Sequence, residues 1–250
     1  MHHLITLIRQ YSLVLIILVI WQFVVAVGIL PDYLLPSPWQ ILHALIDDAK
    51  LLAHHAKYTL ATAFIGTVIG LALSFVLSIL MDLSRNFRQS VYPLILLNQT
   101  IPTIAIAPLL VIWLGYGILP KVVLVVLSVF FPMTIALLDG YRSVSTDELN
   151  LFYSMKANIY QTYRYLKIPS AMGYFFTGLK VALSYALISA VVAEWLGGYY
   201  GLGVYMTRVR KSYELDNMFA VIFLISFLTL ALIALVKWLE RHVLDYQYKE

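Results

Sequence analysis

Long apolar stretches restrict the fold of this chain more than any other feature. A membrane-spanning helix needs about 20 consecutive, mainly apolar residues, and six segments reach or approach that length. They are residues 11–30, 58–81, 91–114, 121–138, 174–196 and 218–237. Charged residues make up only 12% of the chain, too few to cover a soluble domain of 250 residues. The sequence therefore predicts one all-α domain over residues 1–250, a polytopic transmembrane bundle with six spans.

The first stretch is a spanning helix in this interpretation rather than a signal peptide. Residues 11–30 are longer than a typical signal-peptide core, and no small-residue cleavage site follows them. The third stretch contains Pro93, Pro102 and Pro108, which remove backbone donors, so we expect a kinked or broken span there. Gly66 and Gly70 in the second stretch permit close helix approach, and we expect them to serve packing inside the bundle.

Basic residues indicate how the chain is oriented, because they are more frequent in cytoplasmic loops. With both termini in the cytoplasm, the inner segments hold more lysines and arginines than the outer ones, although the cluster at Arg208, Arg210 and Lys211 falls outside. The longest polar interruption, residues 141–170, is then cytoplasmic. It reads as a helix capped by Ser145 or Thr146, and its mixed aromatic and basic composition suits a lipid surface, a protein partner or a solvated connector.

Signatures of enzyme chemistry are absent from the sequence. It contains no phosphate-binding P-loop, no His-Glu-x-x-His, no Gly-x-Ser-x-Gly and no cysteine. All six histidines fall outside the predicted spans, and we expect His54 and His55 to be exposed rather than to bind metal. We therefore expect no catalytic residue, no metal and no cofactor in this chain.

Polar side chains inside the predicted spans are the candidates for a solute path. They are Asn98, Gln99, Thr100 and Thr103 in the third span and Ser184, Tyr185, Ser189 and Glu194 in the fifth. A broken span that carries amides and hydroxyls is typical of a lined aqueous path. Hydrogen bonding between helices explains such a cluster equally well.

Ionisable residues within spans are few, and each is a candidate functional site. Lys180 and Asp139 lie close enough to a span end to extend to the inner interface. Glu194 has a shorter reach. We expect it either to pair with a basic residue such as Arg208 or Arg210, or to accept backbone N–H bonds from the glycine-rich loop at 197–203.

The order of several motifs resembles that of the binding-protein-dependent ABC importer permeases, in the branch with the nitrate, sulfonate, taurine and thiamine-precursor systems. The resemblance covers nearly the whole chain. The motifs are LPSP at 35–38, IPTIAIAPL at 101–109, WLGYG at 113–117, FP at 131–132, TGLK at 177–180, AEWLG at 193–197 and GLG at 201–203. The run at 194–198 and the Lys-Ala at 156–157 look more like the thiamine-precursor members.

The resemblance implies that residues 141–170 hold the helix that couples the permease to its ATPase. Aligned on Ile168 and Pro169, the family's Glu-Ala-Ala falls on Asn150, Leu151 and Phe152, and its glycine falls on Lys156. The hallmark is therefore degenerate. The other matching positions are Ala157, Gln161 and Tyr163. A lysine at the glycine position suggests a more continuous helix or a turn made differently.

The implied function is that of a type I importer permease in a bacterial inner membrane. Its partners would be two ATPase copies carrying ATP and magnesium, a second permease copy, an extracytoplasmic solute-binding protein and lipid, with no nucleic acid. A thiamine pyrimidine precursor or similar heterocycle is the favoured solute, and a sulfonate, taurine or nitrate anion is the alternative. An ion-coupled secondary transporter is the alternative of another class, for which only Glu194 offers a coupling carboxylate.

Overall fold

The computed structural model describes residues 2–29, 31 and 34–244, with side chains from Ser12 onward. The described residues form helices and no strands. The helices are α1 (His2–Ala26), α2 (Pro38–Asp47), α3 (Ala49–Leu83), α4 (Arg85–Thr100), α5 (Thr103–Leu114), α6 (Leu119–Arg142), α7 (Thr146–Ser154), α8 (Ile159–Thr162), the π-helical turn η1 (Tyr163–Lys167), α9 (Ile168–Trp195), α10 (Leu202–Lys211) and α11 (Leu215–Val243).

Capping residues define where the short helices begin. Ser37 accepts the N–H of Gln40, and the Gln40 side chain accepts the N–H of Ser37, with Pro38 at the first helical position of α2. Ser145 and Glu148 form the same reciprocal pair at the start of α7. Ser145 is thus the cap, one of the two residues that the sequence offered.

Three long helices, α3, α6 and α9, form the centre of the bundle. The largest buried cluster joins Val125, Met133 and Leu137 of α6 to residues of the other two helices. A β-carbon on Gly66 would lie 2.5 Å from Val125 Cγ1, and one on Gly70 would lie 3.0 Å from Val129. The prediction that these two glycines serve packing inside the bundle is therefore confirmed.

Four of the described helices are long and apolar enough to cross a membrane: α3, α6, the continuous helical segment 159–195 and α11. The predicted third span is divided between α4 and α5, which meet at an angle of 99° beside Pro102. The expected break is confirmed, and this bent pair would count as a fifth span. In α1 the apolar helix with described side chains is shorter, Ser12–Ala26, and Leu30 lies outside the described residues.

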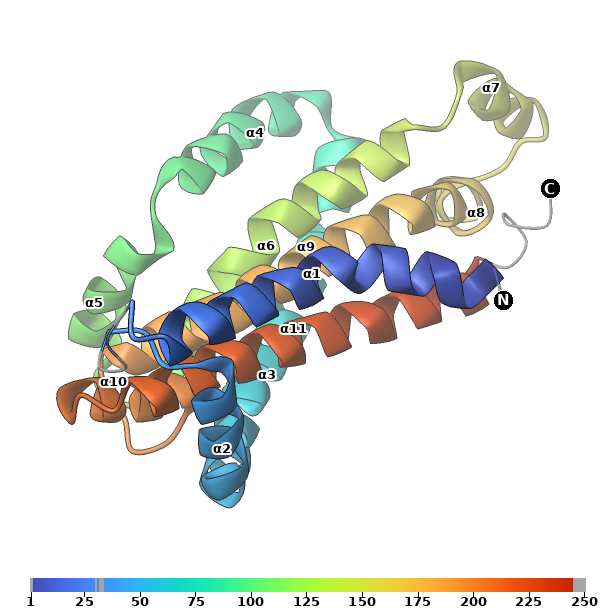
Figure 1. Cartoon of the computed structure of the whole chain (residues 1–250). Coiled ribbons are helices and arrows are strands. Elements are labelled where there is room, and N and C mark those ends of the chain that lie inside the picture. Colours follow the sequence, from blue (N-terminus) through green and yellow to red (C-terminus); the bar gives the residue numbers. More distant parts are fainter. Residues whose placement is uncertain (1, 30, 32–33, 245–250) are drawn as a thin grey trace.

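The two ends of the bundle differ in character (Figure 1). Helices α7 and α8 project at one end, where α1 starts and α11 finishes. Helices α5 and α10 lie at the opposite end. The long polar interruption is thus a projection from the bundle.

Candidate functional site

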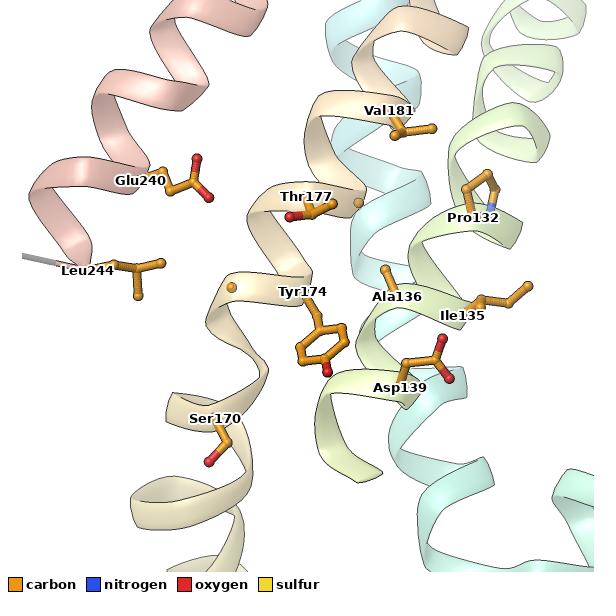
Figure 2. A pocket seen from close by; sticks show the side chains of 12 residues that line it. Pro132, Ile135, Ala136, Asp139, Ser170, Tyr174, Thr177, Val181, Glu240 and Leu244 are labelled. Atoms are coloured by element: carbon orange, nitrogen blue, oxygen red, sulfur yellow. The ribbon is translucent and has the colours of Figure 1, made fainter. Parts of the chain in front are cut away.

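A groove of about 700 Å³ runs between α6, α9 and α11 (Figure 2). Pro132 and Asp139 line it from α6, Tyr174 and Thr177 from α9, and Glu240 from α11. Figure 2 shows Tyr174 on α9 and Asp139 on α6 on neighbouring helices that line the groove. Gly173 and Gly178 also line the groove, and Gly178 lets α9 approach α6, since a β-carbon there would lie 2.6 Å from Ala136 Cβ.

A second cavity of about 430 Å³ lies beside this groove. Pro132 and Val181 line both cavities, so the two are adjacent along α6 and α9. Its polar lining consists of Asn98, Gln99, Thr103, Ser128 and Tyr185. We call the combined feature the α6–α9 groove; α4 and α5 form its other wall in this second part.

The predicted path residues divide between the groove and the packed interior. Asn98, Gln99, Thr103 and Tyr185 line the groove. The other four predicted residues do not line it. The hydroxyls of Thr100 and Ser184 donate to backbone carbonyls of their own helices, those of Leu97 and Lys180. The hydroxyl of Ser189 lies 2.6 Å from that of Ser128, and Glu194 is buried near the α10 end. Sequence reasoning missed Tyr174, Thr177 and Ser170, because one hydroxyl per helical turn does not stand out in a span.

Two charged residues among those described line the groove, Asp139 and Glu240, and both are acidic. The carboxylate of Glu240 accepts from the ammonium of Lys180 at 2.9 Å. Lys180 thus forms an ion pair with a residue near the end of α11, a partner that the sequence analysis did not name. Asp139 is exposed, and within the described part of the chain its carboxylate has no hydrogen-bond or ion-pair partner.

Glu194 holds the loop between α9 and α10. Its carboxylate accepts the N–H of Gly203 at 2.8 Å and lies 3.0 Å from the hydroxyl of Thr59. Of the two roles proposed from the sequence, the structure shows the second, since Arg208 donates to the carbonyl of Tyr199. A β-carbon on Gly201 would lie 2.2 Å from the Glu194 carboxyl carbon, which explains the glycine there.

His55 belongs to the same buried cluster. It is 2% exposed, and its Nδ1 accepts the N–H of Gly201 at 3.1 Å. The expectation that this histidine is exposed is wrong, because α3 begins at Ala49 and extends below the predicted span. Among the described residues, no group of three or more histidines or carboxylates is arranged to hold a metal ion.

The projecting segment consists of α7, a tight turn and α8. Helix α7 buries none of its residues, and Leu151, Tyr153 and Met155 are 59%, 84% and 71% exposed. The Ser145 N–H and hydroxyl bind the Glu148 carboxylate and lower the pKa of that exposed group.

Lys156 makes the turn that the family makes with glycine. Its φ is 55°, in the left-handed region, so the suggestion of a more continuous helix is wrong. The N–H of Ala157 binds the carbonyl of Phe152, and the N–H of Lys156 binds that of Tyr153. These two bonds form a Schellman motif, which satisfies the last carbonyls of α7.

The predicted coupling residues differ in exposure. Asn150, Leu151, Lys156, Gln161 and Ile168 are exposed, and Phe152, Ala157 and Pro169 are partly exposed. Tyr163 is buried instead, with its hydroxyl 2.5 Å from a carboxylate oxygen of Asp82. It therefore faces the bundle rather than the surroundings of α7 and α8.

Comparison with known proteins decides the family. The model of the binding-protein-dependent transport system inner membrane component matches residues 66–245. The chain belongs to this family. As an inner membrane transport component, it works with a solute-binding protein and an ATPase.

Relatives of this inner membrane component share nearly its whole length. The formylaminopyrimidine transport permease protein ThiX of Halalkalibacterium halodurans is 40% identical over 237 residues, 94% of each chain. The taurine transport system permease protein TauC of Escherichia coli is 27% identical over 236 residues, 91% of this chain and 86% of TauC. A solved amino acid ABC transporter has the same fold, with a TM-score of 0.67 at 15% identity, covering 79% of this chain and 96% of that one.

Proposed function

We propose that this chain is the solute-conducting permease subunit of an ATP-driven importer, and that solute moves along the α6–α9 groove. The observation that carries the proposal is that two adjacent cavities, which share Pro132 and Val181, place polar groups along one helix pair. The side chains that bind solute are then Asn98, Gln99 and Thr103 in one part and Tyr174 and Thr177 in the other.

A second copy of the chain closes the path in this proposal. Both cavities are open at the molecular surface, so one chain does not enclose a solute. A homodimer would face two grooves toward each other. Native mass spectrometry of the detergent-solubilised complex tests this, and one permease per two ATPases would contradict it.

The α7–α8 projection is the docking element for the ATPase, one per permease. An exposed apolar surface is costly in water and commonly marks a protein interface, and Leu151, Tyr153 and Met155 form such a surface without packing on the bundle. This end is then cytoplasmic, which places the start of α1 and the end of α11 in the cytoplasm as well. The basic cluster at Arg208, Arg210 and Lys211 lies on α10 at the opposite end, against this bias.

Substitution of Leu151 by Asp tests the docking. A carboxylate placed in an apolar interface loses its hydration, so we expect the tagged permease to purify without the ATPase while its thermal melting is unchanged. Tyr213→Asp is the matched control, because Tyr213 is 87% exposed at the opposite end. Retention of the ATPase by Leu151→Asp would contradict the assignment.

The charge of the groove favours a neutral or cationic heterocycle over an anion. Within the described part of the chain Asp139 has a free carboxylate and Lys180 is paired with Glu240, so the described lining offers an anion no unpaired cation. Two like charges 4 Å apart repel by about 1 kcal/mol even in bulk water. A formylaminopyrimidine-like solute fits this lining, and Tyr174, Tyr185 and Phe131 supply aromatic surface.

Uptake into proteoliposomes with the cognate binding protein and ATPase tests the function. We expect ATP-dependent entry of a labelled aminopyrimidine and no comparable entry of taurine. Asp139→Lys should reverse the charge of the groove and lower aminopyrimidine uptake. Taurine uptake at an equal rate in the unsubstituted protein would favour the anion alternative, and uptake without ATP would contradict the importer.

A further inference from the structure

We infer that Asp82 is a positioning residue that transmits movement of the ATPase-docking projection to the α4–α5 wall of the groove. The inference rests on the proposed function. Two side chains at the base of the projection, Tyr163 and Lys167, both bind one oxygen of Asp82, each at 2.5 Å. We call these three residues the Asp82 clamp.

Asp82 lies close to the junction of α3 and α4, so the clamp acts on the start of α4. Asp82 lies in the last turn of α3, and after Ser84 the chain enters α4 at Arg85. Tyr163 and Lys167 follow α8 directly and lead into α9. The clamp therefore joins two corners of the bundle that are about 80 residues apart in sequence.

The four-residue spacing explains how two side chains reach one oxygen. Tyr163 and Lys167 begin and end η1, and helix positions four apart lie on the same face. The Lys167 ammonium also lies 5.1 Å from the centre of the Tyr163 ring. The Tyr163 ring packs edge-on against the fully buried Tyr141 at 5.6 Å, which fixes its direction.

Burial stabilises the hydrogen bonds and the ion pair of the clamp against exchange with water. The Asp82 side chain is 5% exposed and that of Lys167 is 16% exposed, so water competes weakly for either group. Removing one partner leaves the other charge buried without compensation. A displacement of η1 is therefore expected to carry the end of α3 with it.

Apart from its connection to the end of α3, helix α4 packs loosely on the bundle. It can therefore move together with the end of α3. Its only buried residue among those described is Ile95, and the break near Pro102 separates it from α5 by a 99° bend. The far end of α4 carries Asn98 and Gln99, which line the groove. Movement at the clamp thus reaches groove-lining residues by a route other than the covalent continuation into α9.

The test measures movement of α4 directly. The chain has no cysteine, so pairs of introduced cysteines can carry spin labels without background. One pair, Gln89→Cys and Leu235→Cys, reports α4 against α11; a second pair, Ile159→Cys and Leu235→Cys, reports the projection. Labelled chains are mixed with an excess of unlabelled chains, so that each complex with ATPase carries one pair.

In the otherwise unsubstituted complex we expect ATP to change both distances. In Asp82→Asn we expect the projection to move while the α4 distance stays fixed, and uptake per ATP hydrolysed to fall about ten-fold, within the range typical of a lost allosteric coupling. Lys167→Gln, which keeps the Tyr163 bond, should give an intermediate result and serves if Asp82→Asn does not assemble. The exchange of Asp82 and Lys167 should restore part of the movement.

Asp48→Asn is the matched control, because Tyr205 binds the Asp48 carboxylate in the same way at the opposite end of the bundle. It should leave ATP-driven movement of α4 unchanged. Normal α4 movement in both Asp82→Asn and Lys167→Gln would overturn the inference and leave the proposed function standing. Failure of ATP to move either label pair in the unsubstituted complex would instead contradict the proposed function.

Discussion

The hydroxyl of Thr59 lies 3.0 Å from both carboxylate oxygens of Glu194, a residue 135 positions later in the chain. The same hydroxyl accepts the N–H of Leu202 at 2.8 Å. Thr59 on α3 thus connects the end of α9 to the start of α10. This cluster closes the bundle at the end opposite α7 and α8.

Replacement of Thr59 by Val should destabilise the protein. The substitution keeps the shape but leaves the buried Leu202 N–H without its partner and the Glu194 carboxylate with only the N–H of Gly203, at a cost of about 1–3 kcal/mol. Thermal unfolding in detergent measures the loss. Thr67→Val is the matched control on the same helix. Among the described residues the buried hydroxyl of Thr67 has no hydrogen-bond partner, so its removal should be neutral or stabilising. Equal effects of the two substitutions would contradict the role of Thr59.

Replacement of Gly66 by Ala should separate α3 from α6. The added methyl would lie 2.5 Å from Val125 Cγ1 and 3.1 Å from the Val122 carbonyl, and overpacking of this kind costs about 1–3 kcal/mol. Gly173→Ala places the same methyl in a helix where, apart from the nearby backbone of α9 itself, no atom of the described residues lies within 4 Å. It should raise the melting temperature, because alanine is favoured over glycine by about 1 kcal/mol in a helix. A stable Gly66→Ala protein would show that the helices repack.

Replacement of Lys156 by Gly should strengthen the turn after α7. A non-glycine residue pays roughly 1–2 kcal/mol for the left-handed conformation that Lys156 adopts. Hydrogen exchange should therefore slow at the amides of Lys156 and Ala157, which close the Schellman motif. Lys156→Ala removes the charge without relieving the backbone, so it should not slow exchange. Slower exchange in both variants would assign the effect to charge.

Replacement of Thr103 by Val should lower uptake without affecting assembly. Thr103 lines the groove, and the loss of one neutral hydrogen bond to a solute corresponds to roughly a 3- to 10-fold change in transport efficiency. Thr100→Val is the comparison, because Thr100 lies outside the lining and bonds to the Leu97 carbonyl. Initial rates of ATP-dependent uptake measure both. If Thr100→Val reduces uptake as strongly as Thr103→Val, the lining does not define the path.

Local signals predicted part of the site as well as the fold. The apolar stretches indicated a membrane bundle, and Pro102 indicated the break between α4 and α5 because proline cannot continue the backbone ladder. The cap of α7 at Ser145 could also be predicted from neighbouring residues, since it requires only Glu148 three residues later. Such features depend on neighbours in sequence and can be read without the fold.

The groove could be predicted only in part. Asn98 and Gln99 stand out as amides in an apolar span, so they were found. Thr177 and Tyr174 were missed, because whether a hydroxyl faces a cavity or a neighbouring helix depends on the rotation of α9 in the bundle. Thr100 was predicted to line the path because it follows Gln99 directly in the sequence. In the structure it does not line the groove, and its hydroxyl donates to the Leu97 carbonyl.

The sequence by itself determined that this chain is a helical membrane protein with one polar projection, since hydropathy and helix breakers act along the chain. Only the tertiary structure decided that His55, Thr59 and Glu194 share a buried cluster and that Asp82 binds Tyr163 and Lys167. The physical reason is that a buried polar group must find its partner in space. The partner is selected by how α3 and α9 pack, which no local pattern records.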